Sequence, residues 1–411
     1  MTVTAPARGR PLVGVRVLDL TTFLSGPFAT QILADLGAEV IKLESLDGDS
    51  SRSIPPHFVG DDSAYFLANN RGKRSIAVDL KSPAGLEVAL GLIDRCDVVI
   101  ENFRPGVCAR LGLDAERIRA DRPDLVWASI SGFGQSGPMR DKPAYDMVVQ
   151  ALGGVMSLTG EVGRPAVRLG IPAGDLVAGM YATIGIVSAL LDQQRTGVGR
   201  VIDVSMLDCQ LSMLSYQGVY SLVAGVTPGP QDRGHDSIPT YRSFQGADGR
   251  EFVVTANTER MWRALCEVIG RPELVDDDRF SNARVRLVNR LPLWSVLEAE
   301  FEREPAETWV TALSERSVPA ALIKTVPEAL TDAESAGRDM VVALDAPDGE
   351  NVRVLGNPIK FDTTDPDEFA YPPTLGEHTE QILGDLLNLG ADEVAALLEN
   401  GVVRGTKPRE S

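Results

Sequence analysis

A strand–helix–strand pattern near the start of the chain constrains the fold more than any other feature of the sequence. Val15–Leu20 is apolar at alternate positions, as a strand is, and Glu39–Glu44 has the composition of a second strand. Between them, Pro27 suits the first position of a helix and Gly37 the position just after its end. Two strands joined in this way are parallel, with a right-handed crossover. The connecting turn lacks GxGxxG, so no dinucleotide fingerprint is present.

Strand and helix segments continue to alternate over the first half of the chain, which predicts an α/β fold with an open, mainly parallel sheet. The composition changes at residues 225–230, where Gly-Val-Thr-Pro-Gly-Pro ends an apolar segment. We place a domain boundary there, because a hairpin and several helices are expected over residues 226–330. The further strands expected in the parallel sheet are residues 75–79, 97–100, 125–130 and 201–204.

The charge balance is acidic and argues against some classes of partner. The 411 residues include 40 Lys and Arg against 58 Asp and Glu, a formal net charge of −18. Nucleic acid is therefore not an expected partner. The three dispersed histidines do not suggest a metal site. The four cysteines lack CxxC spacing and no signal peptide is evident, so we expect reduced thiols and a cytoplasmic location.

A single acid separates a Gly/Pro-rich loop from a long uncharged segment. Asp175 follows Gly170–Gly174 and precedes Leu176–Leu191, in which small side chains recur mostly at steps of three and four residues. This spacing predicts a helix with one face that packs close against a neighbour. The segment is shorter than a usual membrane span, so a core helix is expected and no membrane partner. Taken alone, Asp175 is a helix cap, because Asp is among the preferred N-caps.

Polar residues follow two of the predicted strands, at the edge where open parallel sheets bind ligands. Asn102, Phe103 and Arg104 follow one strand and offer an amide, an aromatic face and a cation. The segment Ser131–Pro138 follows another, and its glycines permit a close approach of backbone to ligand.

Three cations stand within four residues at Arg71-Gly72-Lys73-Arg74. One interpretation is a solvated run of charge. The other is a phosphate site, because Arg and Lys are the usual phosphate donors. The sequence pattern alone leaves both open.

In their order along the chain, these segments resemble the class III CoA-transferases. That family includes formyl-CoA:oxalate and carnitine CoA-transferases and their relative alpha-methylacyl-CoA racemase. The likeness extends from Pro11 to Leu387, and its specificity lies in the order and spacing of short motifs. These motifs are Pro11–Asp19, Gly26-Pro27, Leu36–Lys42, Asn70–Ser75, Glu101–Gly106, Ser131–Gly134, Tyr145-Asp146, Gly153-Gly154, Gly174–Leu176, Asn289-Arg290 and Leu375–Thr379.

The resemblance implies an α/β fold with a Rossmann-like large domain built from both chain ends, a small α+β domain, and an interlocked homodimer. Applied to this chain, residues 1–205 form the N-terminal part of the large, CoA-binding domain and residues 206–225 a linker helix. Residues 226–330 form the small domain and residues 331–345 a second linker. Residues 346–411 then return to the large domain.

The resemblance also implies the chemistry. Asp175 corresponds to the family's nucleophile, which would move CoA from an acyl-CoA donor to a free carboxylic acid through covalent aspartyl intermediates. A helix N-terminus would favour the ionised carboxylate that such a nucleophile needs. Coenzyme A and acyl-CoA enter as substrates, and no metal or tightly bound cofactor is expected.

The family likeness further implies a set of binding residues. At or beside CoA contacts lie Phe23, Ser25, Val78, Lys81, Asn102, Phe103, Arg104, Arg110 and Tyr145. Charge, more than family position, adds Arg71, Lys73 and Arg74 as phosphate contacts. His235 is a candidate in a substrate loop. Simpler roles stay open: core packing for Phe103, a surface ion pair for Arg110, and no role for His235.

One position separates transfer from racemisation. The racemase branch has a His before the Asp at the place of Tyr145-Asp146, and it works with the acid at the place of Asp175. Tyrosine is a poor proton acceptor near neutral pH, since its usual pKa is about 10. CoA transfer is therefore favoured. A racemase or epimerase, or a non-catalytic acyl-CoA-binding protein, is the alternative.

The substrate is less defined. Leu24-Ser25 stands where the oxalate enzyme has a polar glutamine, and its glycine run is replaced by Arg233–Pro239. These departures argue against oxalate and suggest a larger or partly apolar acid. Succinyl-CoA or another short dicarboxylic acyl-CoA is the expected donor.

Overall fold

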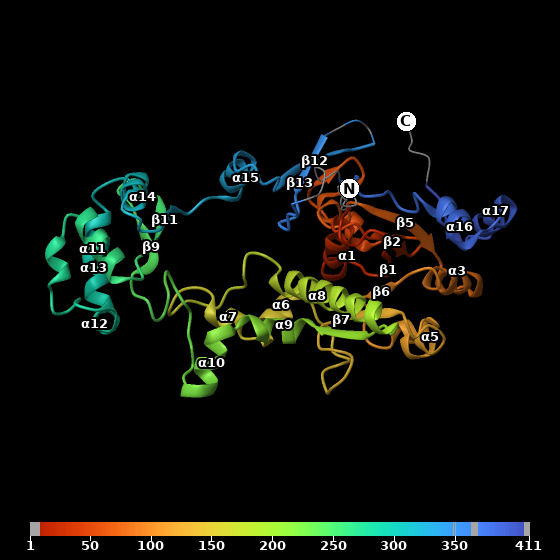
Figure 1. Cartoon of the computed structure of the whole chain (residues 1–411), viewed down its shortest axis with the longest axis horizontal. Helices are drawn as coiled ribbons and strands as arrows, with labels where there is room; N and C mark the ends of the chain where they lie inside the picture. The colour runs from red at the N-terminus through yellow and green to blue at the C-terminus, as the bar shows by residue number, and fades with distance from the viewer. Residues whose placement is uncertain (1–8, 348, 350, 363–368, 407–411) are drawn as a thin grey trace, which may run out of the picture. The chain divides into compact units, whose positions relative to one another are not determined.

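A computed structural model describes residues 9–347, 349, 351–362 and 369–406 and divides the chain into two compact units (Figure 1). The first unit holds residues through Val155, then Arg168–Val219, and residues from Ala336 on. The second holds Met156–Val167 and Tyr220–Ser335. The first unit therefore contains segments from both ends of the chain.

The unit boundaries differ from those predicted at residues 205, 226, 330 and 346. The largest difference is Met156–Val167, which the family resemblance had assigned to the large domain. Backbone hydrogen bonds explain its place in the second unit. The Gln231 N–H donates to the Leu158 carbonyl at 3.0 Å, and the Asp232 N–H donates to the Gly160 carbonyl at 3.1 Å.

The first unit is built on a seven-stranded sheet. All neighbouring strands are parallel except the edge strand β14, which runs antiparallel to β5. Strand β1 lies inside the sheet, and successive strands are added on one side of it and then on the other. The reversal between β1 and β6 is a topological switch point, where open α/β sheets bind ligands. The sheet order is β14 (Val403–Arg404), β5 (Lys73–Val78), β2 (Glu39–Glu44), β1 (Arg16–Asp19), β6 (Val98–Glu101), β7 (Val126–Ser131) and β8 (Val201–Ser205).

Helices cover both faces of this sheet. Successive strand residues point to opposite faces, so Val17 packs under one helical layer and Leu18 under the other. The first layer is α1 (Ser25–Asp35), α8 (Ala173–Thr196) and α9 (Met206–Met213). The second is α3 (Pro83–Ile93), α5 (Ala115–Asp121), α16 (Thr379–Leu387) and α17 (Ala391–Glu399).

Helix α8 packs backbone-close against α1, which confirms the prediction made from its small residues. A Cβ atom on Gly179 would lie 2.7 Å from the Ser25 carbonyl oxygen, so the contact requires glycine. Ala178 and Ala182 are fully buried on the same face. By length and composition α8 is the one described helix that could span a membrane, a test that the core helix of a soluble protein also passes.

Two helical segments of the chain are interrupted by residues with a positive φ. The segment from Tyr145 to Ser157 is split into α6 (Asp146–Leu152) and α7 (Val155–Leu158), because Gly154 takes a φ of +79°. The segment from Ser205 to Ala224 is split into α9 and α10 (Ser215–Ala224), with Ser215 at a φ of +48°.

The remaining elements of the first unit are short. They are η1 (Ser50–Ser53), α2 (Ala64–Leu67), α4 (Val107–Arg110) and two antiparallel pairs, β3 (Phe58–Val59) with β4 (Asp62–Ser63) and β12 (Val341–Asp345) with β13 (Asn351–Leu355).

The second unit has its own core around a three-stranded antiparallel sheet. Phe244, Phe252 and Phe301 meet there, with ring centroids 4.7–6.3 Å apart. The sheet is β11 (Ala320–Leu322), β10 (Glu251–Thr255) and β9 (Tyr241–Gln245). Its helices are α11 (Glu259–Val268), η2 (Pro272–Val275), α12 (Ala283–Val288), α13 (Arg290–Phe301), α14 (Ala306–Glu315) and α15 (Val326–Ser335).

Candidate active site

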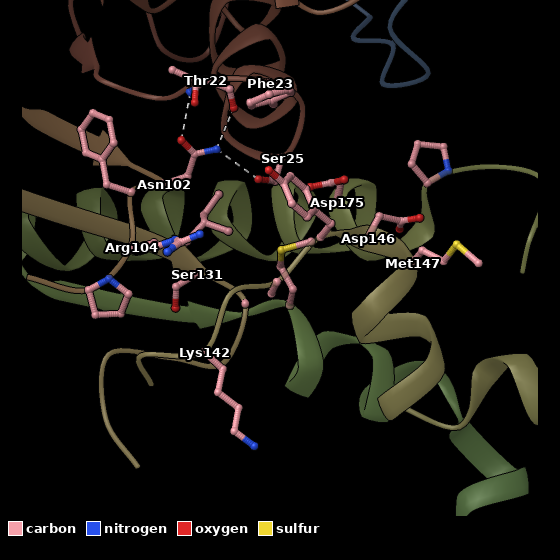
Figure 2. Close-up of a pocket in the computed structure, with 18 of the residues that line it drawn as sticks. Thr22, Phe23, Ser25, Asn102, Arg104, Ser131, Lys142, Asp146, Met147 and Asp175 are labelled. Carbon is pink, nitrogen blue, oxygen red and sulfur yellow. Dashed lines mark hydrogen bonds between the residues drawn. The ribbon is translucent and has the colours of Figure 1, made fainter. Parts of the chain in front are cut away.

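A cavity of about 510 Å³ opens at the carboxyl ends of β1, β6 and β7 in the first unit. This is the switch point of the sheet. The residues that line it include Phe23 and Ser25 after β1, Asn102–Pro105 after β6, and Ser131 after β7. Figure 2 shows side chains from these loops converging near Asp175.

Asn102 joins the loop after β1 to the end of β6. Its Oδ1 accepts a hydrogen bond from the Thr22 N–H at 2.9 Å, and its Nδ2 donates to the Thr22 carbonyl at 2.8 Å (Figure 2). The same amide nitrogen lies 3.4 Å from the Ser25 Oγ. Asn102 therefore holds Ser25 and the start of α1 in place beside the cavity.

Asp175 lines the cavity from the first turn of α8, where it is partly buried. The expectation that it is the N-cap is wrong: the N-cap is Pro172, and Asp175 is the third residue of the helix. Its carboxylate accepts a hydrogen bond from the hydroxyl of Ser25, the first residue of α1.

The capping role belongs to Asp146, at the start of α6. Its Oδ1 accepts a hydrogen bond from the Gly174 N–H at 2.7 Å, and its Oδ2 accepts one from Gln150 Nε2 at 2.7 Å. The buried Gln150 also accepts from the Leu169 N–H at 3.0 Å. A Cβ on residue 174 would lie 2.9 Å from Asp146 Oδ1 and 2.7 Å from Val149 Cγ2, so glycine is required before the acid.

A helix N-terminus favours the ionised form of Asp175, as predicted, but two other effects act against ionisation. Burial and the negative charge of Asp146 raise the pKa of Asp175 to about 7, and the hydrogen bond from Ser25 offsets only part of this. The carboxyl is consequently divided between its two protonation states near neutral pH.

Cations collect at the β6 side of the cavity. Arg104 and Arg140 line it. A Cβ atom added at Gly106 would lie 3.4 Å from Arg110 Nη1 and 3.7 Å from Arg140 Nη2. These two guanidinium groups therefore flank the same turn. Among the described residues, Arg104, Arg110 and Arg140 form a single ion pair, in which Arg140 Nε lies 4.0 Å from Asp141 Oδ1.

The three cations predicted to contact phosphates do not line this cavity. Arg71 is buried and paired with Asp35 at 2.6 Å. Arg74 pairs with Glu39 at 2.6 Å. These two charges are paired within the protein, and the phosphate role suggested for this run stays a prediction.

Lys73 is the most enclosed of the three. It lies 3.1 Å from Asp19 and 2.8 Å from the Asn70 amide oxygen. Its burial lowers the pKa of Lys73 to about 8, while Asp19 opposes that change. Burial also acts against ionisation of Asp19, but Lys73 and Lys42 lower the pKa of that carboxyl to about 2.

Of the other residues predicted to bind CoA, some line the cavity and some do not. Phe23, Phe103 and Tyr145 line it, and Phe103 also packs against the core. Val78 is buried at the end of β5 and Lys81 is exposed beyond it, both outside the lining.

His235 lies in the second unit, where its ring stacks on Tyr241 with centroids 5.8 Å apart. Its Nδ1 accepts a hydrogen bond from the Ser237 N–H at 3.1 Å. The role proposed for it at a substrate stays a prediction.

The lining residues that the sequence analysis did not predict include Tyr65, Arg140, Lys142 and Arg168. Burial raises the pKa of Tyr65 to about 12, with further contributions from Asp175, Asp49 and Asp146, so its hydroxyl stays protonated. Arg140 and Lys142 follow the glycine-rich loop after β7, which is a signal that could have found them. Among the described residues, no group of three His, Cys, Asp or Glu side chains could hold a metal ion.

Comparison with known proteins identifies the family of this chain. The model of CoA-transferase family III matches residues 12–379. The chain belongs to this family. A succinyl-CoA:glutarate CoA-transferase from Mus musculus is 35% identical over 96% of this chain and 90% of its own length. An acetyl-CoA:oxalate CoA-transferase from Acetobacter aceti is 39% identical, with 92% and 96% covered.

The solved structure of a CAIB/BAIF family protein from Brucella suis superimposes with a TM-score of 0.81 at 36% identity, covering 92% of this chain and all of the other. These matches confirm the predicted family and the prediction that the chain is a CoA-transferase. Acyl-CoA is the substrate that enzymes of this family use. The match to the Brucella suis structure also supports the mixed α/β fold with its large, mainly parallel sheet.

Proposed function

We propose that this CoA-transferase works through covalent intermediates on Asp175. An Asp175 carboxylate oxygen attacks the thioester carbonyl of the donor, the C–S bond breaks, and an aspartyl–acyl anhydride and CoA thiolate form. The thiolate then attacks the aspartyl carbonyl, which releases the donor acid and leaves an aspartyl-CoA thioester. Each step exchanges one acyl bond for another, so the free energy of the thioester is retained.

The return half of the cycle reverses these steps with a second acid. The acceptor carboxylate attacks the aspartyl carbonyl and expels the thiolate, giving a new anhydride. The thiolate then attacks the acceptor's acyl carbon, and the Asp175 carboxylate leaves. No metal and no tightly bound cofactor takes part.

One observation carries this proposal: a carboxylate sits in the first turn of a helix, inside the cavity at the switch point, and is hydrogen-bonded by Ser25. The positive end of the helix dipole favours the oxyanions that form at the carbonyl carbons. Burial raises the basicity of the carboxylate and so its strength as a nucleophile when ionised.

The cations beside β6 fit the phosphates of CoA in this proposal. Arg104 lines the cavity, and Arg110 and Arg140 place two guanidinium groups beside the turn at Gly106. Guanidinium groups bind phosphate oxygens bidentately. Phe103 and Asn102 then bind the part of CoA that lies between these phosphates and Asp175.

The substrates we propose are short dicarboxylic acids and their CoA esters, with succinyl-CoA as a donor. The relatives named above act on glutarate and on oxalate, both of which carry two carboxylates. Because Leu24-Ser25 stands where the oxalate enzyme has a polar glutamine, oxalate is the less favoured of these two acids.

We also propose that the protein forms a homodimer. The face of α8 turned away from α1 exposes a continuous apolar stripe, which monomeric surfaces rarely do. A second copy of the chain would cover it, and light scattering on the purified protein tests the state directly. The stripe consists of Met180, Tyr181, Ile184, Val187 and Leu191.

Trapping the intermediate tests the mechanism. The protein is incubated with succinyl-CoA and hydroxylamine, and peptides are analysed by mass spectrometry. We expect a hydroxamate on Asp175, and loss of CoA exchange in Asp175→Asn. Asp192→Asn, near the other end of α8 and paired with Arg200, is the matched control and keeps its activity. Exchange that persists in Asp175→Asn contradicts the mechanism.

A further inference from the structure

The cations that line the cavity are held by different segments. Arg104 and Arg140 belong to the β6 side, around Gly106. Arg168 lines the same cavity but comes from the loop that leads to α8, seven residues before Asp175. Arg168 is thus separated along the chain from Arg104 and Arg140, and from Lys142, which also lines the cavity.

The segment that carries Arg168 is tied to the segment that carries Asp175. The Leu169 N–H donates to Gln150 Oε1 at 3.0 Å, and the Nε2 of this buried glutamine donates to Asp146 at 2.7 Å. Asp146 in turn accepts from the Gly174 N–H at 2.7 Å. One buried amide thus fixes the backbone next to Arg168 and the carboxylate that caps the start of α8.

The charge of Arg168 is not neutralised inside the protein. Its side chain is exposed, and its hydrogen bond is to the neutral carbonyl of Leu169 at 3.2 Å. Across the described residues, no carboxylate lies within 4.0 Å of its guanidinium group to form an ion pair. A cation of this kind at a cavity wall is available to an anionic ligand.

The need for such a cation follows from the cavity's own charges. Asp146 and Asp175 both line it. A dicarboxylic acid that presents one carboxyl to Asp175 brings a second negative charge into this acidic surrounding, and that charge is repelled unless a cation receives it. A guanidinium fork matches a carboxylate in shape and charge.

We propose that Arg168 binds the distal carboxylate of a dicarboxylic substrate while its other carboxyl reacts at Asp175. This inference rests on the proposed transfer at Asp175 and adds the residue that selects dicarboxylic over monocarboxylic acids. Arg168 does not touch the reacting carbonyl, so its effect falls on substrate choice.

A paired-acceptor assay tests this. CoA transfer from succinyl-CoA is measured with glutarate and with valerate, which replaces the distal carboxylate by a methyl group at equal chain length. The readout is the ratio of kcat/KM for the two acids, in which any effect on the donor cancels. Wild type prefers glutarate, and we expect the ratio to fall at least tenfold in Arg168→Gln and less in Arg168→Lys.

Arg164→Gln is the matched control, because Arg164 is an exposed arginine on the preceding loop, 4.0 Å from Glu161. Its ratio stays at the wild-type value. A ratio unchanged in Arg168→Gln, or a wild-type preference for valerate, overturns the assignment while transfer at Asp175 stands. Wild type that forms no Asp175 hydroxamate with succinyl-CoA and transfers CoA to neither acid overturns both proposals.

Discussion

The carboxylate of Asp146 accepts a hydrogen bond from the Gly174 N–H at 2.7 Å, one residue before Asp175. A single side chain thereby caps the helix that carries the proposed nucleophile and places a like charge beside it. The first effect fixes the position of Asp175, and the second, together with burial, raises the pKa of Asp175 to about 7. Geometry and protonation of the nucleophile are therefore coupled through Asp146.

Substitution Asp146→Asn separates these two effects. The amide keeps an oxygen for the Gly174 N–H, although its NH2 group replaces the oxygen that accepts from Gln150. It removes the negative charge, so the pKa of Asp175 falls. In wild type, we expect kcat/KM to rise with pH through about 7 as Asp175 ionises. In the variant, we expect this rising limb at lower pH.

The measurement is a pH profile of CoA transfer at subsaturating acyl-CoA. The control is Asp192→Asn, which removes a charge from α8, the helix of Asp175, but far from that residue. We expect its pH profile to match that of wild type. A rising limb that stays at the wild-type pH in Asp146→Asn would show that Asp146 does not set the protonation of Asp175.

The raised pKa also predicts how Asp175 affects stability. The folded state holds this proton up to about pH 7, whereas the ordinary carboxyl value is 3.8. The folded state therefore binds the proton more tightly, and ionised Asp175 destabilises it increasingly as the pH rises from about 4 to 7. Asp175→Asn removes the charge, so its Tm should exceed that of wild type at pH 8 and approach it near pH 4. Calorimetry at both pH values checks this, and equal Tm values at pH 8 would contradict it.

Much of the large sheet was predictable because its strands are buried on both faces and read as apolar segments. The βαβ unit at the start was predicted from Pro27, Gly37 and their flanking strands, and the structure has it as β1, α1 and β2. The short edge strand β14 was missed, since Val403–Arg404 is too brief to give a periodic signal.

The site was less predictable, because side chains at one place come from distant segments. The charge run at Arg71–Arg74 looked like a phosphate site, yet the partners Asp35 and Asp19 are more than 30 residues away in sequence. In the other direction, Arg168 gave no signal. A Gly/Pro-rich loop does not reveal which of its side chains lines a cavity.

The glycine before Asp175 is predicted to be essential for activity more than for folding. In Gly174→Ala, the new Cβ would lie 2.7 Å from Val149 Cγ2 and 2.9 Å from Asp146 Oδ1, so the cap must shift. We expect kcat to fall at least tenfold, with a stability loss of about 1–3 kcal/mol from overpacking. Gly384→Ala, within α16 and with open space at its Cβ, is the control and should be neutral or slightly stabilising. Steady-state kinetics and urea denaturation measure both, and full activity in Gly174→Ala would refute the requirement.

Two arginines distinguish a binding role from a structural one. Arg140 is exposed on the cavity wall, so Arg140→Gln should raise the KM for acyl-CoA about tenfold, in line with the ~1.5–3 kcal/mol of a charge-assisted hydrogen bond, at unchanged Tm. Arg71 is buried against Asp35, so Arg71→Gln removes a buried ion pair and should lower stability by about 3–5 kcal/mol. Its KM for acyl-CoA should stay near the wild-type value, because Arg71 does not line the cavity. A raised KM at unchanged Tm in Arg71→Gln would instead restore the phosphate role that the charge run suggested.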